Sequence, residues 1–409
     1  MSKVCLIKVS GRDQPGITNA ITGLLARHSV NILDIGQAVI HNNLALGMLT
    51  ELPADFSVEQ LVPQLHKTLA SFTVDVQVAP VGADEYHVWV GEQGRPRHIL
   101  TLLARKIRAD HVQQVTGLIA SHQLNIDKIT RLSGRVALSG ETGRSESACI
   151  EFSLRGAWPD ETKMRSEFLE LGNALDADIA VQQDDMFRRN RRLVAFDMDS
   201  TLIEAEVIDE LAVCAGVGAQ VAQITESAMR GEVEFAESFR RRVALLRGLP
   251  ETALVEVADG LKLVEGAKEL LVTLKHLGYK TAILSGGFDF FAQRLQQQLG
   301  FDYVYANELH IVDGIVSGEV HGEVIDGQRK AELLQDIARR ENISLQQVIA
   351  VGDGANDLPM LSLAGLGVAF RAKPLVKQSA RQSISRLGLD SILYLLGISE
   401  RERLPPAPR

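Results

Sequence analysis

The feature that most constrains the fold is a short apolar run that ends abruptly in two carboxylates. Residues 193–196 read Leu-Val-Ala-Phe, and they are followed by Asp197 and, two residues later, Asp199. A run this short and this apolar is typical of a buried parallel strand, and open α/β sheets bind ligands where such strands end. Side chains at positions i and i+2 of an extended chain point the same way, so we expect both carboxylates to face one small volume.

Two carboxylates held close together repel each other unless a cation lies between them or one of them keeps a proton. The pair Asp197 and Asp199 therefore indicates a metal site, an acid/base pair, or both. The same five residues, Asp-Met-Asp-Ser-Thr, could also begin a turn with acidic caps. The motif alone does not decide between these interpretations, and the choice depends on later segments of the chain.

Length and composition set broad limits on the class of protein. A chain of 409 residues is expected to form two to three domains at ~100–200 residues each. A hydrophobic content of 45% and a charged content of 23% are typical of soluble globular proteins, and a net charge of -9 does not favour a nucleic-acid partner. No apolar run approaches the ~18 residues that a membrane span needs, and charges near the N-terminus argue against a signal peptide. We therefore expect a cytoplasmic enzyme with no membrane partner.

The first 80 residues predict one small α/β domain. Residues 3–10 read as a strand, and Ile17, Ile21 and Leu24 then recur at helical spacing. The remaining patterns complete a strand–helix–strand–strand–helix–strand order, which is the ferredoxin-like arrangement. Residues 81–96 contain several glycines and a proline and are expected to be a linker, although 86–90 could form an edge strand.

A second copy of the same pattern follows at 97–185. Residues 122–129 repeat the pattern of 28–35 at a shift of 94 positions, and strand and helix patterns surround both segments in the same order. Internal duplication is the economical explanation.

These two units resemble ACT domains, which are regulatory modules that commonly bind amino acids. The resemblance implies a ligand site in the first unit at the turn 11–16, with Asp13 and Gly16 as candidate ligand residues, because backbone amides at a helix start favour anions. The second unit has Arg105–Asp110 at this position without the Pro-Gly pair, so it departs from the family pattern. The alternative is a pair of dimerisation scaffolds that bind no ligand, and a homodimer is expected with either.

The C-terminal half, 186–400, alternates strand and helix patterns. Three apolar strands are each followed by polar groups: Asp197 and Asp199, then Ser285-Gly286-Gly287, then Gly352–Asp357. No strand pattern interrupts the helical patterns at about 206–264, which predicts a helical cap over the first strand end. The fold class expected here is a doubly wound, mostly parallel sheet, preceded by the two ferredoxin-like units.

The polar groups at these strand ends suit phosphoryl transfer. Asp197 can serve as the nucleophile and form an aspartyl-phosphate, and Asp199 can serve as the general acid and base. Hard, oxygen-ligated Mg²⁺ matches a carboxylate set that includes Asp353. Ser285 and Gly286 offer a hydroxyl and an N–H to phosphate oxygens.

Two further positions belong to the same hypothesis. Lys330 begins a helical pattern and offers a counter-charge to the phosphate, and Asn356 and Asp357 follow Asp353 closely. Each of these signals is weak alone, since an isolated lysine is usually a surface residue. Their order along the chain, each at a strand end or helix start, makes coincidence a poor explanation.

Together these segments resemble the four motifs of the haloacid dehalogenase-like superfamily, and within it the phosphoserine phosphatases. The resemblance implies that Asp197, the main-chain carbonyl of Asp199 and Asp353 hold Mg²⁺, with Asp357 beside them. It also implies that Lys330 is catalytic and contacts the substrate.

The resemblance further implies how a substrate with an amino acid end would be recognised. Glu206, nine residues after the nucleophile, would receive the ammonium group, and Arg242 would receive the carboxylate, for which a guanidinium fork is a strong partner. Met229 and Phe235 would cover the substrate, and Ser285, Gly286, Lys330 and Asn356 would complete its site. The sequence leaves open whether Arg242 or one of its neighbours in the run 240–242 faces the substrate.

The expected reaction is hydrolysis of O-phospho-L-serine to L-serine and phosphate, the last step of serine synthesis, with an amino acid such as serine as effector. One alternative is a phosphotransferase that passes the phosphoryl group to another alcohol such as homoserine. A second is an amino-acid-binding regulator whose phosphatase half is vestigial. The basic run 188–192 is expected to be a solvated linker, and 401–409 a disordered tail.

Overall fold

The computed structural model describes residues 3–135, 147–158, 160–230 and 232–404. By its internal contacts the chain divides into two units, Met1–Arg95 and Pro96–Arg409. Each unit is described below by itself. Among the described residues, no helix combines the length and the hydrophobicity that crossing a lipid bilayer would require.

The first unit is a four-stranded antiparallel sheet in the order β2-β3-β1-β4. Its core lies between the sheet and two amphipathic helices, because Ile17, Ile21 and Leu24 of α1 and Leu61 and Leu65 of α2 are buried at helical spacing. The predicted strand and helix order is confirmed. The elements are β1 (Lys3–Arg12), α1 (Ile17–Arg27), β2 (Asn31–Ile40), β3 (Asn43–Leu52), α2 (Val58–Leu69), β4 (Val74–Val81) and α3 (Ala83–Glu92).

Helix α3 corrects one expectation. Residues 86–90 are helical and do not form an edge strand. Asp84 and Glu85 lie in the first turn of α3, where carboxylates interact favourably with the helix dipole. A strand of this length would have needed an open sheet edge to pair with, whereas a helix satisfies its own backbone groups.

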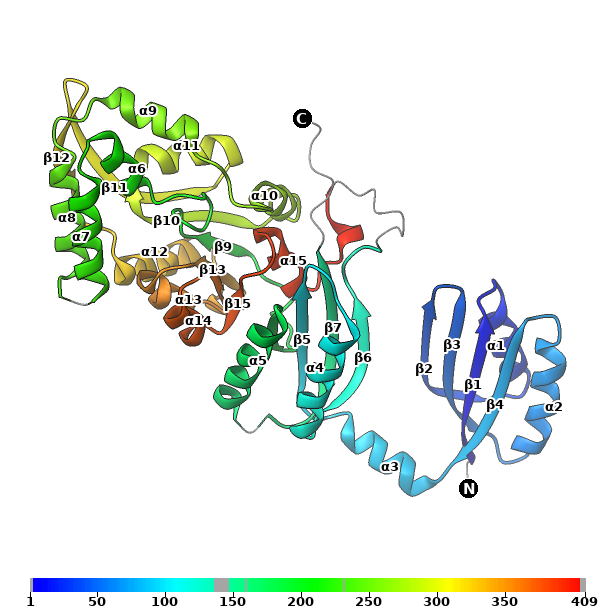
Figure 1. The fold of residues 1–409 in the computed structure, drawn as a ribbon. Helices are drawn as coiled ribbons and strands as arrows, with labels where there is room; N and C mark the ends of the chain where they lie inside the picture. Colours follow the sequence, from blue (N-terminus) through cyan, green and yellow to red (C-terminus); the bar gives the residue numbers. More distant parts are fainter. Residues whose placement is uncertain (1–2, 136–146, 159, 231, 405–409) are drawn as a thin grey trace. The chain divides into compact units, whose positions relative to one another are not determined.

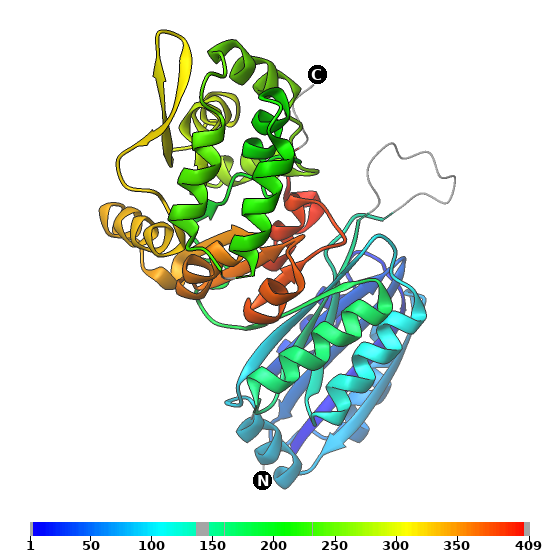
Figure 2. The same cartoon turned by 60° about the vertical axis from the view of Figure 1, so that its left-hand side comes forward.

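The second unit begins with a sheet of the same topology, β6-β7-β5-β8. Helices α4 and α5 cover one face of it (Figure 2), with Val115, Ile119, Met164 and Phe168 in the core between the layers. The two four-stranded sheets share one strand order, as the repeated sequence pattern predicts. The elements are β5 (Arg97–Ala104), α4 (Ala109–Ser121), β6 (Asn125–Arg131), β7 (Ala148–Arg155), α5 (Glu161–Leu175) and β8 (Asp178–Gln183).

The rest of the second unit is built on a seven-stranded sheet in the order β12-β11-β10-β9-β13-β14-β15. All neighbouring pairs are parallel except the β11–β12 hairpin. That hairpin turns at Asp313-Gly314, as predicted, with both residues at positive φ. The strands are β9 (Leu193–Phe196), β10 (Lys280–Phe288), β11 (Tyr303–Val312), β12 (Ile315–His321), β13 (Val348–Gly352), β14 (Leu366–Phe370) and β15 (Gln382–Ile384).

Helices cover both faces of this sheet, which explains why β9 is apolar at every position. Val194 and Phe196 pack into one core with α10, α11 and α15, and Leu193 and Ala195 pack into the other with α12, α13 and α14 (Figure 1). The doubly wound fold class is confirmed. The helices are α10 (Ala267–His276), α11 (Asp289–Leu299), α12 (Gly327–Arg340), α13 (Leu358–Leu363), α14 (Pro374–Ser379) and α15 (Ile392–Leu395).

The predicted helical cap is also present. Four helices follow β9 before the chain returns to the sheet: α6 (Val207–Cys214), α7 (Gly218–Met229), α8 (Phe235–Leu245) and α9 (Glu251–Gly260). Two boundaries near the strand ends differ from expectation. Helix α12 begins at Gly327, so Lys330 lies within its first turn, and β10 continues through Ser285-Gly286-Gly287 to Phe288 with a register shift against β11.

The segment between the second four-stranded sheet and β9 is not a solvated linker, which corrects the expectation for 188–192. The guanidinium of Arg188 is buried and donates to the carboxylate of Glu151 on β7. Arg191 is buried too and donates to the carbonyl of Gln346. A buried charge requires a partner. The partner of Arg188 is Glu151, which lies 37 positions earlier in the chain.

The end of the chain is partly ordered by contacts of the same kind. Residues Glu400–Glu402 form a 3₁₀ turn, and Arg403 donates to Asp390 at 2.7 Å and lies over the ring of Tyr394. The expected disorder therefore does not extend over 401–404, and residues 405–409 lie outside the described residues.

Candidate active site

The site begins where β9 ends against β13. The backbone N–H of Asp197 donates to the carbonyl of Val351 at 2.9 Å, so the first residue after β9 is still held by the neighbouring strand. Its carboxylate oxygen Oδ1 accepts from the N–H of Met198 at 2.8 Å. Ser200 has φ of 56°, a left-handed conformation that is uncommon for residues other than glycine. This tight turn keeps Asp197 and Asp199 at the mouth of the strand.

Lys330 is completely buried beneath Asp197. Its ammonium lies 2.8 Å from Oδ1 of Asp197 and 2.7 Å from Oδ1 of Asp357. Helix α12 positions it, and Asp326 caps that helix by accepting from the N–H of Arg329. Although burial disfavours the charged ammonium, the two carboxylates raise the pKa of Lys330, so this residue keeps its proton.

The carboxylates outnumber the cation. Burial, together with the charge of Asp357, raises the pKa of Asp197 to about 8. Burial likewise raises the pKa of Asp353 to about 7, and burial with the charges of Glu206 and Asp197 raises that of Asp199. Without a further cation this cluster holds extra protons at neutral pH, which is the electrostatic signature of a site that accepts positive charge.

The donor set fits a hard divalent cation. Carboxylate oxygens of Asp197, Asp353 and Asp357 all lie within 4.8 Å of one another. Both oxygens of Asp357 already have partners, because Oδ1 contacts Lys330 and Oδ2 accepts from the N–H of Gly354 at 2.9 Å. Asp197 and Asp353 therefore offer the available carboxylate oxygens, and Asp357 orients Lys330 beside them. Oxygen ligands of this kind suit Mg²⁺.

The end of β10 supplies small polar groups close to the carboxylates. A Cβ atom at Gly287 would lie 2.7 Å from Oδ2 of Asp199, and one at Gly286 would lie 3.0 Å from the ring of Phe235. Only glycine lets the backbone approach this closely. The hydroxyl of Ser285 accepts from the N–H of Gly287 at 2.9 Å, so its own proton remains able to donate to a ligand.

One cavity of about 880 Å³ joins these strand ends to the helical cap. Most of the site residues predicted from the sequence line this cavity: Asp197, Asp199, Glu206, Phe235, Arg242, Ser285, Gly286, Asp353 and Asn356. Lys330 and Asp357 are fully buried and do not line it, and the ammonium of Lys330 binds both Asp197 and Asp357. The side chain of Met229 lies outside the described residues, and its neighbour Ala228 lines the cavity.

The structure answers which arginine of the run 240–242 faces the cavity. Arg240 and Arg241 are exposed, whereas Arg242 is partly buried and lines the cavity. Its Nη1 donates weakly to Thr225 at 3.5 Å, and its Nε is buried without a hydrogen-bond partner among the described residues. An unpartnered buried donor favours binding of an acceptor. Burial lowers the pKa of Arg242. The charges of nearby acidic residues such as Asp209 raise it, but by less.

Glu206 also lines the cavity. Its carboxylate accepts from the hydroxyl of Ser200 at 2.8 Å, and it precedes helix α6 as the N-cap residue. It raises the pKa values of both Asp199 and Asp353 through its charge. A cationic group bound beside Glu206 would be favoured by this excess of negative charge.

Several cavity residues were not identified from the sequence. Lys373 lies at the start of α14, and its charge lowers the pKa of Asp353, against the larger effect of burial. Asp209, Thr225, Ser238 and Gln328 also line the cavity. Asp209, Thr225 and Ser238 lie on cap helices with no motif around them, and Gln328 lies in the first turn of α12. The Lys-Pro pair that begins α14 after a strand end was the one available signal for Lys373.

The two candidate ligand residues of the first unit lie in the turn between β1 and α1. The N–H of Asp13 donates to the carbonyl of Asn42 at 2.8 Å. Gly16 has φ of 97° and precedes α1, which has no side-chain cap. The role of these two residues as ligand contacts stays a prediction.

Comparison with known proteins places both parts in described families. Residues 191–365 match the model of the haloacid dehalogenase-like hydrolases, and residues 3–79 match an ACT domain model. Among curated proteins, the chain is 39% identical to phosphoserine phosphatase SerB2 of Mycobacterium tuberculosis, over 97% of this chain and 94% of that protein. It is 38% identical to a phosphoserine phosphatase of Streptomyces coelicolor, over 97% and 93%.

Solved structures give the same result. A HAD family hydrolase from Salmonella enterica serovar Typhi superposes with a TM-score of 0.62 at 31% identity, covering 73% of this chain and 98% of that one. A probable phosphoserine phosphatase from Vibrio cholerae superposes with a TM-score of 0.59 at 34% identity, covering 73% and 86%.

Proposed function

Because the chain belongs to the phosphoserine phosphatase family of haloacid dehalogenase-like hydrolases, we propose that it hydrolyses O-phospho-L-serine to L-serine and phosphate at the carboxyl end of β9. The observation that carries the proposal is the cavity in which Asp197 and Asp199 face Arg242 and Glu206 of the cap region. These are the groups needed to break a phosphate ester and to recognise an amino acid.

The substrate carries three charged groups, and the cavity offers a partner for each. Arg242, with its unpartnered Nε, binds the carboxylate as a charge-assisted pair. Glu206 binds the ammonium group. The Ser285 hydroxyl and the backbone of Gly286 bind phosphate oxygens at the end of β10. Phe235 covers the substrate from the cap, since its ring contacts Gly286 closely.

The reaction proceeds in two steps. In the first, an oxygen of Asp197 attacks phosphorus, and the bond between phosphorus and the serine oxygen breaks. Asp199 gives its proton to that oxygen, which its raised pKa permits at neutral pH. In the second, Asp199 takes a proton from water as the water oxygen attacks phosphorus, and the Asp197 carboxylate leaves. Lys330 stays charged and stabilises the negative charge on Asp197 and the phosphoryl oxygens.

Mg²⁺ is the proposed cofactor, held by Asp197 and Asp353 with the main-chain carbonyl of Asp199. When bound, it neutralises phosphoryl oxygens and lowers the pKa of the carboxylates that contact it. The support is the excess of carboxylates over Lys330 and the cluster of their oxygens. Asp357 holds Lys330 at 2.7 Å and so keeps the ammonium beside Asp197.

An amino acid effector, such as serine, is proposed for the first unit at the turn that contains Asp13 and Gly16, and a homodimer for the whole protein. The support is the uncapped start of α1, where backbone N–H groups favour a carboxylate. The test is equilibrium dialysis of radiolabelled L-serine against the wild type and Gly16→Val, with Gly23→Ala as control. Equal binding by all three proteins would remove the turn from the proposal.

Two alternatives use the same residues. A phosphotransferase would pass the phosphoryl group from Asp197 to an alcohol such as homoserine. A regulator with a vestigial phosphatase half would not need Lys330 held at 2.8 Å from Asp197, and the intact cluster favours an enzyme.

The deciding experiment measures phosphate release from O-phospho-L-serine and from p-nitrophenyl phosphate with Mg²⁺, with and without added homoserine. We expect release from phosphoserine with a far higher kcat/KM than from p-nitrophenyl phosphate, and no new phosphoester. Formation of O-phosphohomoserine would identify the transferase. Turnover of p-nitrophenyl phosphate alone would remove the roles of Arg242 and Glu206.

A further inference from the structure

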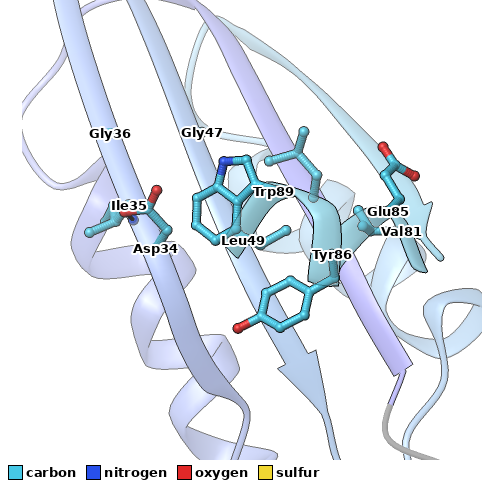
Figure 3. A pocket seen from close by; sticks show the side chains of 10 residues that line it. Asp34, Ile35, Gly36, Gly47, Leu49, Val81, Glu85, Tyr86 and Trp89 are labelled. Carbon is cyan, nitrogen blue, oxygen red and sulfur yellow. Dashed lines mark hydrogen bonds between the residues drawn. The ribbon is translucent and has the colours of Figure 1, made fainter. Parts of the chain in front are cut away.

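The first unit carries a cavity of about 320 Å³ that has no role in the proposed reaction or at the turn 11–16. It lies between α3 and the face of the sheet that α1 and α2 leave open (Figure 3). Residues from all four strands or strand ends and from α3 line it: Leu6, Asp34, Ile35, Gly36, Gly47, Leu49, Val81, Glu85, Tyr86 and Trp89.

The floor of this cavity is made by two glycines. Gly36 of β2 lies directly opposite Gly47 of β3 in the sheet register. A Cβ atom at either position would meet no other atom within 4 Å, and neither residue is among those with positive φ. Neither the backbone conformation nor crowding therefore requires glycine here. Glycine inside a strand weakens it and often marks a place where a ligand approaches the backbone closely.

The wall opposite the floor is aromatic. Tyr86 and Trp89 lie one helical turn apart on α3, with ring centroids separated by 5.9 Å. Both rings are half-buried on the sheet side of a helix that has no fully buried residue. In Figure 3 the indole of Trp89 lies next to the strands that carry the two glycines. A flat group can therefore stack between the aromatic rings and the bare backbone of the floor.

The charge of the cavity is negative. Asp34 and Glu85 flank the two rings on opposite sides in Figure 3, and among the described residues no lysine, arginine or histidine lines the cavity. Lys8 of β1 lies opposite Gly47 in the sheet register but is not one of the lining residues. Aromatic faces and carboxylates both attract cations. A guanidinium group is flat, stacks on aromatic rings and pairs with carboxylates through its N–H donors, so it matches this site better than a compact ammonium group.

We propose that this cavity binds a guanidinium group, either of a free small molecule or of an arginine side chain in a protein segment. The group stacks between Trp89 and the Gly36–Gly47 floor and pairs with Asp34 or Glu85. The proposal is independent of the phosphatase activity, and no catalytic residue takes part in it.

The test uses the full chain with Trp158→Phe, which leaves Trp89 as the single tryptophan of the two in the sequence. Agmatine, N-acetyl-L-arginine amide and, for comparison, n-butylamine are titrated while the Trp89 emission is recorded. We expect a saturable change with the guanidinium compounds and a response at least about tenfold weaker with the amine. Agmatine binding without binding of the capped arginine assigns a free small molecule, and binding of both assigns an arginine side chain.

Two variants test the cavity itself. Gly47→Val fills the floor at a position with open space, so we expect agmatine binding to weaken at least about tenfold without loss of the fold. Gly23→Ala, at a helical glycine that also has no atom within 4 Å of its Cβ position, is the matched control and should bind as before. No saturable response to agmatine, or equal binding by Gly47→Val, overturns the proposal. So would a change of sedimentation mass in Gly47→Val with no ligand response, because it would assign this face to contact with a second copy.

Discussion

Two long cationic side chains are fully buried in the second unit, and their surroundings differ in charge. Arg188 faces the single carboxylate of Glu151, between the second four-stranded sheet and the start of the seven-stranded one. Lys330 faces Asp197 and Asp357 directly, with Asp199 and Asp353 close behind. The first cluster is electrically balanced, and the second carries an excess of negative charge.

The two clusters differ in function: the Arg188–Glu151 pair joins two parts of the fold, whereas the cluster around Lys330 can take part in a reaction. Because the two charges of the buried Arg188–Glu151 pair cancel, the pair creates no excess charge for a ligand to neutralise. The Nε and Nη1 atoms of Arg188 have no hydrogen-bond partner among the described residues. An unbalanced cluster raises the pKa values of its own carboxylates and is completed by a cation and a phosphate group. This contrast predicts opposite effects of substitutions at the two clusters.

Replacing Asp197 should have the largest effect on activity and little effect on the fold. Asp197→Asn keeps the shape and removes the nucleophile, so we expect kcat for phosphoserine to fall by at least about a thousandfold. Thermal unfolding of the metal-free variant should be no easier than that of the wild type, because the substitution also relieves repulsion among the carboxylates. A variant that keeps a tenth of the wild-type kcat would contradict the assignment.

Replacing Arg188 should do the reverse. Arg188→Met leaves Glu151 buried without its partner, so we expect the free energy of unfolding to fall by about 3–5 kcal/mol while kcat per folded molecule is retained. Urea unfolding followed by circular dichroism gives the first quantity. Arg189→Met, an exposed neighbour, is the control and should change neither value. Loss of kcat in a fully folded Arg188→Met protein would mean that the two clusters are not separate.

Replacing Arg242 should affect substrate recognition alone. Arg242→Met removes the partner of the substrate carboxylate, so we expect kcat/KM for phosphoserine to fall about 10–100-fold and that for p-nitrophenyl phosphate to stay nearly constant. Arg241→Met, whose side chain is exposed and paired with Glu237, serves as the control. Equal losses with both substrates would show that Arg242 supports the cap rather than the substrate.

The unbalanced cluster also predicts how stability depends on pH. In the metal-free protein the pKa values of Asp197 and Asp353 are raised to about 8 and about 7. At a pH above 3.8, the ordinary pKa of an aspartate, the folded state therefore binds more protons than the unfolded state. Stability from this source is present at low pH and is lost as the pH rises toward about 8. The Tm of chelator-treated protein should therefore fall across this range more than that of Asp197→Asn, and Mg²⁺ should restore it. A Tm that falls equally in both proteins would contradict this origin.

The smallest effect is expected at a third ion cluster of the same unit. Arg105 donates to Glu265 at 2.7 and 2.6 Å, and Glu265 also accepts from Arg371 at 3.0 Å. The side chains of Arg105 and Glu265 are 43% and 32% exposed, so solvent weakens the pair. Arg105→Met should lower the free energy of unfolding by at most about 1 kcal/mol. A loss as large as that of Arg188→Met would show that exposure does not set the difference.

Arg105 also marks a difference between the two four-stranded domains, 1–80 and 97–185. In the first unit the turn after β1 ends in Gly16 and leads into an uncapped helix. In the second four-stranded domain, 97–185, the corresponding segment begins with Arg105. This residue is paired with Glu265 on the loop before α10. The missing Pro-Gly pair could be read from the sequence, but the contact that takes its place could not, because the two residues are 160 positions apart.

The catalytic cluster was largely predictable because chemistry and secondary structure coincide there. Asp197, Asp199 and Asp353 follow apolar strands, Ser285 lies in the last part of β10, and parallel strands bring their ends to one edge of the sheet. The position of Lys330 in the first turn of α12 follows the same logic. Arg242 could not be separated from its two neighbours by sequence, since its burial depends on how α8 packs against the rest of the cap.

Burial of the basic run 188–192 could not be predicted for a related reason. A run of arginines is normally solvated. Nothing in the local sequence indicates that Arg188 pairs with Glu151 on β7. Helix α3 was missed because five residues are too few to separate helical from strand periodicity. For Arg188 the deciding interaction is a long-range contact rather than a local pattern.

The central claim is that Asp197 carries the phosphoryl group during turnover. Acid quenching of the enzyme during hydrolysis of phosphoserine, followed by mass spectrometry of its peptides, measures this directly. The account predicts a covalent phosphate on the peptide that contains Asp197 in the wild type and none in Asp197→Asn. Sustained turnover with no covalent phosphate on that peptide, or a phosphate on another residue, would contradict it.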